Sequence, residues 1–190
     1  METQSRILRI VHYPAPVLRK KAAPIDRVTP EIARFMDEMV ETMYADNGVG
    51  LAAPQVGISL RIIVVDVGDG PLHLVNPVII AREGSQTGVE GCLSLPNLHG
   101  DVVRAMKVTV RALNIHGKKV TLSGEGLWAR AMQHEIDHLD GILFTDHVDP
   151  ATLHWVTTEE GHDGDYIERP TTLEDALHLF EREASLMKSS

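Results

Sequence analysis

The sequence is poor in cysteine and in aromatic residues, and it has no long apolar run. The single cysteine among 190 residues, Cys92, excludes an intramolecular disulfide, so the fold does not depend on an oxidising compartment. Only 4% of the residues are aromatic, so the core must be mainly aliphatic. No apolar segment approaches the roughly 20 residues of a membrane span, and the polar amino terminus lacks the apolar core of a signal peptide. We therefore expect a soluble cytoplasmic protein without a membrane partner.

Positive charge is also scarce. Lys and Arg number 18 against 27 Asp and Glu, which gives a net charge of −9. Because phosphate contacts require clustered Lys and Arg, this balance argues against a specific nucleic-acid partner. The length fits one domain with a substantial core, and the hydrophobic fraction of 43% is ordinary for a globular protein.

The pattern along the chain predicts helices before and after a cluster of strands. Thr29 and Pro30 supply the cap and the first residue of a helix that ends at Asn47. Apolar and β-branched residues predict strands at residues 62–67, 74–80, 102–113 and 120–122. A loop is expected at 82–89 and a second helix at 125–139. This order predicts an α+β fold, a single domain in which short, mostly antiparallel β-sheets pack around the second helix.

Composition changes after Asp149, so we divide the chain into residues 1–150 and 151–190. Residues 157–169 are acidic and are expected to form a linker or a mobile loop. Residues 171–174 (TTLE) resemble a capping box and predict a C-terminal helix that packs on the same domain. The expected apolar stripe of this helix consists of Leu173, Leu177, Phe180, Ala184 and Met187.

The most informative stretch of the chain is residues 134–138 (HEIDH). Residues four apart on an α-helix differ by about 40° around the axis and roughly 6 Å along it. His134 and His138 can therefore bind one divalent metal from the same face of a helix. Glu135 then lies beside the metal, where it can accept a proton from water. The plainer alternative is an amphipathic helix whose histidines have no role in metal binding.

Two histidines need a third protein ligand to make a catalytic zinc or iron site. The metzincin pattern requires a third histidine where this chain has Phe144, so that pattern does not fit. A downstream glutamate, Glu159 or Glu160, is one option for the third ligand. Cys92 is the remaining soft donor, and a thiolate with two imidazoles suits Fe(II), Zn(II), Co(II) or Ni(II).

Three separated motifs of the chain resemble those of the peptide deformylase family. They are residues 48–55 (GVGLAAPQ), 90–96 (EGCLSLP) and 133–138 (QHEIDH). Their order and intervals match the family, and the resemblance covers about residues 5–148. It implies one divalent metal ion bound by Cys92, His134 and His138. It also implies a hydrolase that removes the N-formyl group from the N-terminal formylmethionine of newly made polypeptides and releases formate.

The resemblance also implies catalytic roles for Glu135 and Gln55, and the backbone N–H of Leu93 is a further candidate. Glu135 would accept a proton of the attacking water and later deliver it to the departing amine. The Gln55 amide and the backbone N–H of Leu93 would donate to the oxyanion, and one such donor is typically worth about 3 to 4 kcal/mol in the barrier. The thiolate should favour Fe(II), and with it sensitivity to oxygen. We also expect an ion pair between Arg104 and Asp137 that fixes the metal-binding helix.

A methionine side chain requires an apolar pocket beside the metal. The expected substrate-binding residues are Val49, Gly50, Glu90, Gly91, Leu127, Arg130 and Ala131. Gly50 lets the main chain approach the substrate, and Glu90 is expected to make a structural hydrogen bond to its own loop. Arg130 stands where many family members carry an apolar residue. Its aliphatic stem can line the pocket while its charge reaches solvent.

Two rival functions use the same histidines. A zinc endopeptidase would cleave unformylated peptides, and its metal content would survive replacement of Cys92. A structural metal site would be closed by a fourth protein ligand such as His99, His147 or His154. For a deformylase the partner is the formylated nascent peptide, and the net charge leaves room for a transient contact with the ribosome through a local basic patch.

Overall fold

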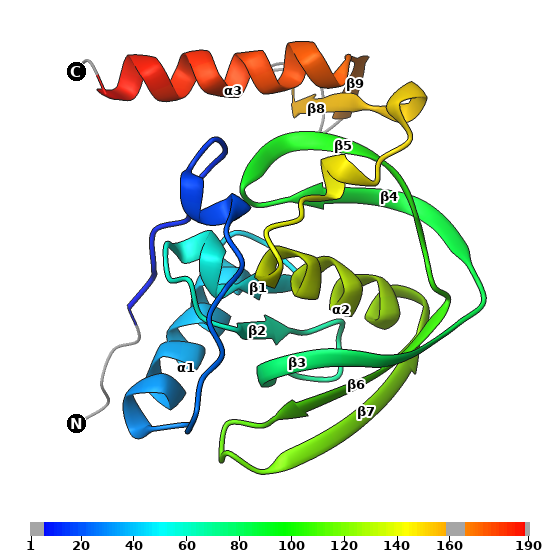
Figure 1. The fold of residues 1–190 in the computed structure, drawn as a ribbon. Coiled ribbons are helices and arrows are strands. Elements are labelled where there is room, and N and C mark those ends of the chain that lie inside the picture. Colours follow the sequence, from blue (N-terminus) through cyan, green and yellow to red (C-terminus); the bar gives the residue numbers. More distant parts are fainter. Residues whose placement is uncertain (1–5, 159–165, 189–190) are drawn as a thin grey trace.

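A central helix lies between two antiparallel β-sheets (Figure 1). The computed structural model describes residues 6–158 and 166–188. One sheet has five strands in the order β1-β2-β3-β6-β7, and the other has four in the order β4-β5-β8-β9. Every paired strand runs antiparallel to its neighbour. The predicted α+β class, with antiparallel sheets around a central helix, is confirmed.

The five-stranded sheet contains β1 (Gly50–Ala52), β2 (Ile62–Val65), β3 (Leu72–Glu83), β6 (Lys107–Leu113) and β7 (Lys119–Glu125). The four-stranded sheet contains β4 (Gln86–Cys92), β5 (Leu95–Arg104), β8 (His154–Thr158) and β9 (Tyr166–Pro170). The α-helices of the described residues are α1 (Pro30–Ala45), α2 (Gly126–Leu139) and α3 (Leu173–Lys188). The short 3₁₀ helices there are η1 (Pro16–Arg19), η2 (Ala53–Val56), η3 (Phe144–Asp146) and η4 (Pro150–Thr152).

Local sequence explains where each α-helix begins. The hydroxyl oxygen of Thr29 accepts the backbone N–H of Ile32 at 3.4 Å, so Thr29 caps α1 as predicted. Gly126 begins α2 with a φ of 61°, a conformation that side chains disfavour. Thr172 caps α3, because its hydroxyl oxygen accepts the backbone N–H of Asp175 at 3.1 Å.

The predicted strand over residues 102–113 is wrong, because the chain changes sheet within it. β5 ends at Arg104 in the four-stranded sheet, and β6 begins at Lys107 in the five-stranded sheet. Even-numbered residues on both sides of the break are buried, as Val102 and Val108 are. In the structure the alternation fails at the break, where Met106 is 41% exposed. In the sequence, residue 106 is apolar as the alternation requires, so periodicity alone does not reveal the break.

The predicted loop over residues 82–89 is also wrong. β3 continues to Glu83, and β4 begins at Gln86. A turn at Gly84, whose φ is 63°, connects the two strands. The turn sends the chain into the four-stranded sheet, so that β4 lies across α2 from the five-stranded sheet (Figure 1). Cys92 is the last residue of β4.

The predicted linker over residues 157–169 is wrong at both ends, where β8 pairs with β9. Its middle, residues 159–165, lies outside the described residues and includes four of the five acidic residues of that segment. Beyond β9, the buried Phe180 of α3 belongs to an apolar cluster that also contains Leu95, Leu98 and Val102 of β5. Met187 is 75% exposed, so the predicted apolar stripe ends before it. No described helix has the length and apolar character needed to cross a membrane.

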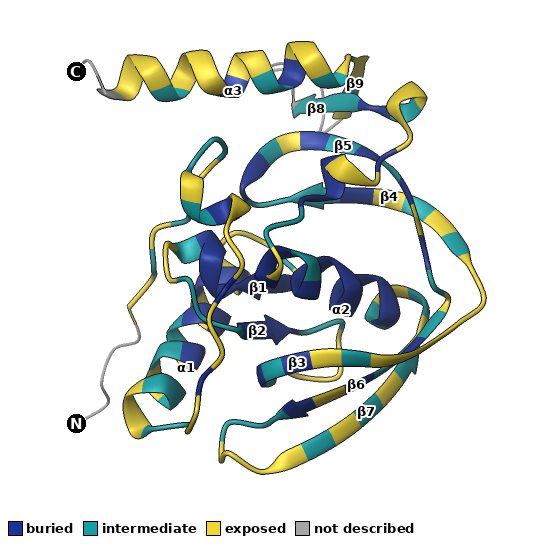
Figure 2. Ribbon diagram, viewed as in Figure 1, coloured by how far each residue is buried: buried dark blue, intermediate teal, exposed yellow. Residues whose placement is uncertain are grey.

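The core positions α2 between the sheets, and Figure 2 shows that this helix is buried along most of its length. Its apolar residues, among them Met132 and Ile136, pack against the five-stranded sheet. A second cluster contains Leu98 of β5 and Phe144 just beyond α2. A third joins α1 to β1 and β2. Because α2 is enclosed, the polar side chains that it carries need partners within the protein.

Candidate metal centre and active site

Three ligand atoms from β4 and α2 converge between the two sheets. The Sγ atom of Cys92 lies 3.3 Å from His138 Nε2, which lies 3.2 Å from His134 Nε2. All three atoms lie within 4.8 Å of one another. Within residues 6–158 and 166–188, no other set of three or more His, Cys, Asp or Glu side chains meets in this way.

The chemistry and spacing of these donors fit a divalent cation. Bonds of about 2.3 Å to sulfur and about 2.0 to 2.1 Å to nitrogen place tetrahedral ligand atoms roughly 3.3 to 3.6 Å apart. The separations from His138 Nε2 to Cys92 Sγ and to His134 Nε2 are close to that spacing. Burial lowers the pKa of His138 well below its ordinary value, which favours the neutral ring that a metal ligand requires. Three protein ligands leave a tetrahedral cation with one further position.

Glu90 of β4 orients the first histidine. His134 Nδ1 donates to Glu90 Oε2 at 2.9 Å, which directs Nε2 of the same ring toward the other two ligands. Arg104 holds the same carboxylate with two bonds of 2.9 and 3.0 Å. Burial alone would raise the pKa of Glu90, but the bonds from His134 and Arg104 lower it far below its usual value. The predicted bond of Glu90 to its own loop is thus wrong, because its partners lie on α2 and β5.

The predicted ion pair between Arg104 and Asp137 is confirmed. Arg104 Nη1 lies 2.5 Å from Asp137 Oδ2. Since the same guanidinium also holds Glu90, Arg104 ties the middle of the metal-binding motif to both β4 and β5. One arginine therefore constrains both the helix that carries the histidines and the strand that carries the cysteine.

Gln55 presents a donor to the metal centre. Its Oε1 accepts the backbone N–H of Ala52 at 2.8 Å, which orients the amide so that Nε2 lies 3.5 Å from Cys92 Sγ. The side chain is only 1% exposed, and its backbone carbonyl accepts the N–H of Val11 at 2.8 Å. Leu93, the other expected donor, lies in the turn directly after Cys92 and lines the cavity beside these ligands that is described below.

Glu135 is buried on α2 beside the ligands. Burial raises its pKa from the ordinary 4.5 to about 7, so the carboxylate can exchange a proton near neutral pH. Its Oε2 makes no hydrogen bond within the described part of the chain. A buried carboxylate oxygen without a partner is suited to a water molecule or a substrate. Glu135 therefore has the protonation chemistry and the free acceptor that a general base requires.

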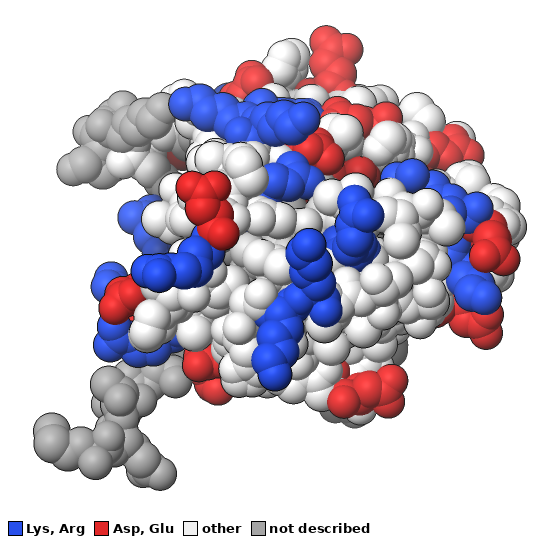
Figure 3. All heavy atoms as spheres, turned by 60° about the horizontal axis from the view of Figure 1, so that its bottom comes forward, with Lys and Arg blue, Asp and Glu red and all other residues white. Residues whose placement is uncertain are grey.

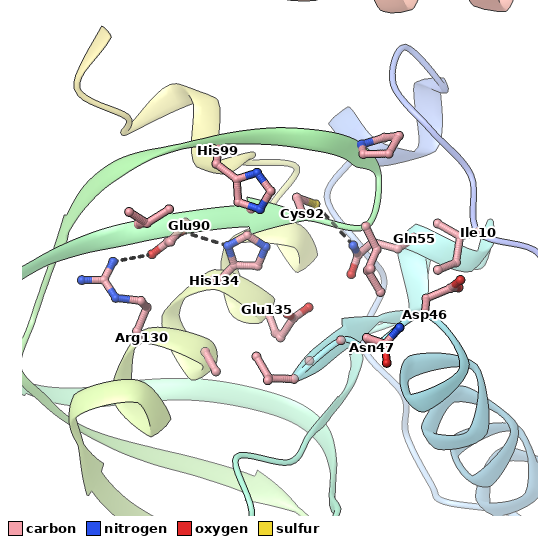
Figure 4. A pocket seen from close by; sticks show the side chains of 18 of the residues that line it. Ile10, Asp46, Asn47, Gln55, Glu90, Cys92, His99, Arg130, His134 and Glu135 are labelled. Carbon is pink, nitrogen blue, oxygen red and sulfur yellow. Dashed lines mark hydrogen bonds and ion pairs between the residues drawn. The ribbon is translucent and has the colours of Figure 1, made fainter. Parts of the chain in front are cut away.

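A cavity of about 540 Å³ opens beside the metal centre (Figure 4). Its volume lies within the range of small-ligand sites. All of the predicted substrate-binding residues line it: Val49, Gly50, Glu90, Gly91, Leu127, Arg130 and Ala131. Val49 and Leu127 are 44% and 54% exposed, whereas Ala131 is buried, so the apolar wall runs from the surface inward.

Two strands at the edges of their sheets border this cavity. β1 is the last strand of the five-stranded sheet, and β4 is the last strand of the four-stranded sheet. Gly50 of β1 and Gly91 of β4 both line the cavity. The backbone groups on an unpaired strand edge can bind an extended peptide as an added strand.

The charge of Arg130 does not reach solvent, so that prediction is wrong. The residue is only 7% exposed, and its Nη1 donates to Glu90 Oε1 at 2.8 Å and to the carbonyl oxygen of Val102 at 2.9 Å. Figure 4 shows it at one end of the cavity, bonded to Glu90. The buried carboxylate of Glu90 keeps the guanidinium of Arg130 away from solvent, because a charge-assisted hydrogen bond between them satisfies both groups.

The alternative ligands do not join the metal centre. His147 contacts a carboxylate of α2, and His154 contacts a backbone carbonyl. His99 lines the cavity but is not part of the cluster of ligand atoms. Glu159 and Glu160 lie outside the described residues. The described part of the chain therefore supplies three donors from two elements.

Some residues of the cavity escape prediction from the sequence. His12, from the segment before η1, lines it, as do Asp46 and Asn47 just after α1, which Figure 4 shows at the opposite end of the cavity from Arg130. Asn47 has a φ of 55°, and its only signal in the sequence is that of a helix stop. Nothing local in the chain indicates that these segments meet at a site.

Comparison with known proteins agrees with this geometry. The family model described as polypeptide deformylase matches residues 7–154. The chain belongs to the peptide deformylase family. The peptide deformylase of Desulfitobacterium hafniense is 57% identical over 140 residues, which cover 74% of this chain and 93% of that protein. The peptide deformylase of Halothermothrix orenii is 56% identical and covers 75% of this chain and 94% of its own length.

Solved peptide deformylase structures have the same fold. The Legionella pneumophila enzyme is 36% identical and has a TM-score of 0.75. The alignment covers 97% of this chain and 96% of that one. The Thermotoga maritima enzyme is 42% identical, with a TM-score of 0.75 over 76% of this chain and 99% of its own. The protein is thus a metal-dependent hydrolase that removes the N-formyl group from nascent peptides, as predicted. The endopeptidase and the purely structural metal site are set aside.

Proposed function

We propose that deformylation takes place at the metal centre, with Cys92, His134 and His138 as ligands and Glu135 as the proton carrier. One observation supports this most strongly. A thiol and two imidazoles lie within 4.8 Å of one another, beside a cavity whose wall also contains Glu135. A divalent cation held there supplies Lewis acidity, which lowers the pKa of water toward neutrality.

Glu135 moves the proton in both halves of the reaction. It accepts a proton from water as the water oxygen attacks the formyl carbon. It then delivers that proton to the amine nitrogen as the carbon–nitrogen bond breaks, which yields formate and a free amino terminus. A pKa of about 7 suits this exchange, because the group is then neither too weak a base nor too weak an acid at neutral pH.

Gln55 and Leu93 stabilise the negative charge that develops on the formyl oxygen. The orientation of the Gln55 amide aims its NH₂ group at the site before any substrate arrives. The backbone N–H of Leu93, in the turn after Cys92, is the second donor. Donors that are fixed in advance stabilise the transition state without reorganising during the reaction.

The peptide binds as an added strand between β1 and β4. Both strands are at sheet edges, and both line the cavity. The methionine side chain then enters between Val49, Leu127 and Ala131. Gly50 and Gly91 let the two backbones approach the peptide closely.

The proposed metal is Fe(II), with Zn(II), Ni(II) and Co(II) as ions that share these donors. The thiolate of Cys92 is the reason, because it softens the Lewis acidity of the ion. We also infer a cytoplasmic location and a transient ribosomal contact, since the substrate is a nascent peptide. Figure 3 shows basic side chains among acidic and uncharged ones on the face that it presents.

Formate release tests the proposal directly. Formyl-Met-Ala-Ser is incubated anaerobically with the iron-loaded protein and with Glu135→Gln. The substitution keeps the size of the side chain but removes the base, so the rate should fall by at least about 100-fold. Formate at equal rates from both proteins would overturn the role of Glu135. Cys92→Ser should lose the metal, and an unchanged metal content would overturn the ligand set.

A further inference from the structure

The metal ligands belong to two different packing units. The buried apolar residues of α2, the helix of His134 and His138, pack in the cluster of the five-stranded sheet. Cys92 of β4 belongs to the cluster of the four-stranded sheet. Just beyond the carboxyl end of α2, Leu143 and Phe144 enter that second cluster and join the two units there. The first half of α2 reaches β4 by a different connection.

Arg130 makes most of this second connection, beside a bond of 2.9 Å from Gln86 Nε2 of β4 to the carbonyl oxygen of Gly126. Its Nη1 donates to Glu90 Oε1 at 2.8 Å, and its Nη2 lies 3.4 Å from the carbonyl oxygen of Gln86, so it contacts β4 at two positions. Nη1 also donates to the carbonyl oxygen of Val102 on β5 at 2.9 Å. One buried guanidinium on α2 therefore binds both strands of the facing hairpin.

β4 is built to receive this side chain. A Cβ atom on Gly88 would lie 3.1 Å from Arg130 Nη2 and 3.4 Å from its Cζ, so the glycine provides the space that the guanidinium occupies. β4 has a paired neighbour, β5, on one side only. The contacts from Arg130 on α2 therefore add to the pairing of β4 with β5.

The Glu90 carboxylate leaves no acceptor position unused. It accepts two bonds from Arg104, one from Arg130 and one from His134. A carboxylate has about four such positions. Loss of Arg130 would leave Glu90 Oε1 with one donor fewer and the buried Val102 carbonyl without its side-chain donor. Because buried polar groups without partners are costly, β4 would then be expected to move away from α2 so that water can reach them.

We propose that Arg130 is a positioning residue that sets the separation between β4 and α2, and thereby between Cys92 and the two histidines. It acts through Glu90, which also orients the ring of His134. The same contact fixes one end of the substrate cavity, since Arg130 and Glu90 both line it. The inference rests on the proposed ligand set and adds to it the device that preorganises the ligands.

Metal retention tests this role without relying on activity. The full-length, metal-loaded wild type, Arg130→Met and Arg130→Lys are mixed with excess chelator, and the rate of metal release is measured. Arg130→Met keeps the length of the side chain but removes every bond, so release should accelerate at least about 10-fold. Arg130→Lys keeps the charge but not the planar fork, and a smaller acceleration is expected. Arg111→Met, at an exposed position of β6, is the matched control and should release metal like the wild type.

Three further measurements separate the outcomes. Thermal unfolding of the same samples shows whether each variant is folded. If Arg130→Met does not fold, the rate of metal release from Arg130→Lys tests the proposal. A lower midpoint with unchanged metal release and unchanged KM means a structural role alone and overturns the proposal. A raised KM for formyl-Met-Ala-Ser together with faster metal release supports it. Cys92→Ser is measured in the same experiment, and if it retains metal the ligand set is wrong. If Cys92→Ser loses metal but Arg130→Met releases it like the wild type, the ligand set stands and the proposed role of Arg130 is disproved.

Discussion

Gly50 lies directly against the side chain of Glu135: a Cβ atom at residue 50 would lie 2.8 Å from both Cγ and Cδ of the glutamate. Cβ atoms essentially never approach other atoms within 3.0 Å, so any side chain at residue 50 must displace the carboxylate. The sequence suggests a glycine here for close approach of the substrate. The structure gives it a second purpose, which is to leave room for the proton carrier.

Gly50→Ala should therefore impair catalysis while the metal stays bound. The new methyl group pushes Glu135 away from the attacking water, and a displacement of about 1 Å can reduce the rate about 100-fold. Steady-state kinetics and metal content of the same preparation check this. Gly48→Ala is the control, because its closest contact is the flexible end of the Leu93 side chain at 3.0 Å. Equal kcat losses in the two variants would contradict the explanation.

Glu135→Gln should make the metal-free protein more stable at high pH only. Burial raises the pKa of Glu135 from 4.5 to about 7, so the folded state holds this proton more tightly than the unfolded state does. The wild type then loses stability as pH rises from about 4.5 to about 7, and the loss is complete above 7. Glutamine stays neutral, so its advantage should be on the order of 3 kcal/mol or less at pH 8 and near zero at pH 4.

Chemical denaturation of both metal-free proteins at pH 4 and pH 8 measures this difference. A stabilisation that is the same at the two pH values would mean that packing, and not the buried charge, separates the variants. The comparison also tests a stability–function trade-off, because the ionised carboxylate of Glu135 destabilises the fold and is also the proposed proton carrier.

The sequence predicts the fold best where the signal is local. The cap at Thr29 and the i, i+4 pair of histidines each specify a helix within a few residues, and both helices are confirmed. The break between β5 and β6 has no such signal, because residue 106 is an apolar methionine where the alternation expects one, although its side chain is 41% exposed in the structure. A change of sheet depends on which surface the chain packs against, and a single strand pattern does not record that.

The same limit applies to the site. His134, Glu135 and His138 are recognisable because their geometry follows from one helix. The bond between Arg130 and Glu90 joins residues 40 positions apart on two elements, so neither residue shows its partner locally. An exposed position is the usual expectation for an arginine, and only the buried carboxylate across from it reverses that expectation.

Phe180→Ala should destabilise the whole protein if α3 packs as part of one cooperative unit. Phe180 is 4% exposed and contacts the rings of Tyr13 and Trp155, with centroids 6.4 and 5.5 Å away. Truncation of such a side chain costs about 3 kcal/mol or more. Denaturant unfolding should show one transition with a lower midpoint. Met187→Ala, on the exposed end of the same helix, should change little, and a separate early transition in Phe180→Ala would argue that α3 unfolds by itself.

Gln55→Glu should separate the structural role of Gln55 from its catalytic one. A glutamate at this position can still accept the backbone N–H of Ala52, as Oε1 does now at 2.8 Å, but it has no NH₂ group to offer the oxyanion. Removal of one such donor lowers kcat by about 100- to 1,000-fold, and KM should change much less because the donor acts in the transition state. Gln55→Ala removes both interactions and should lower the thermal midpoint as well. If Gln55→Glu retains wild-type kcat, the oxyanion is stabilised by other donors, and the amide serves only to hold η2 against β1.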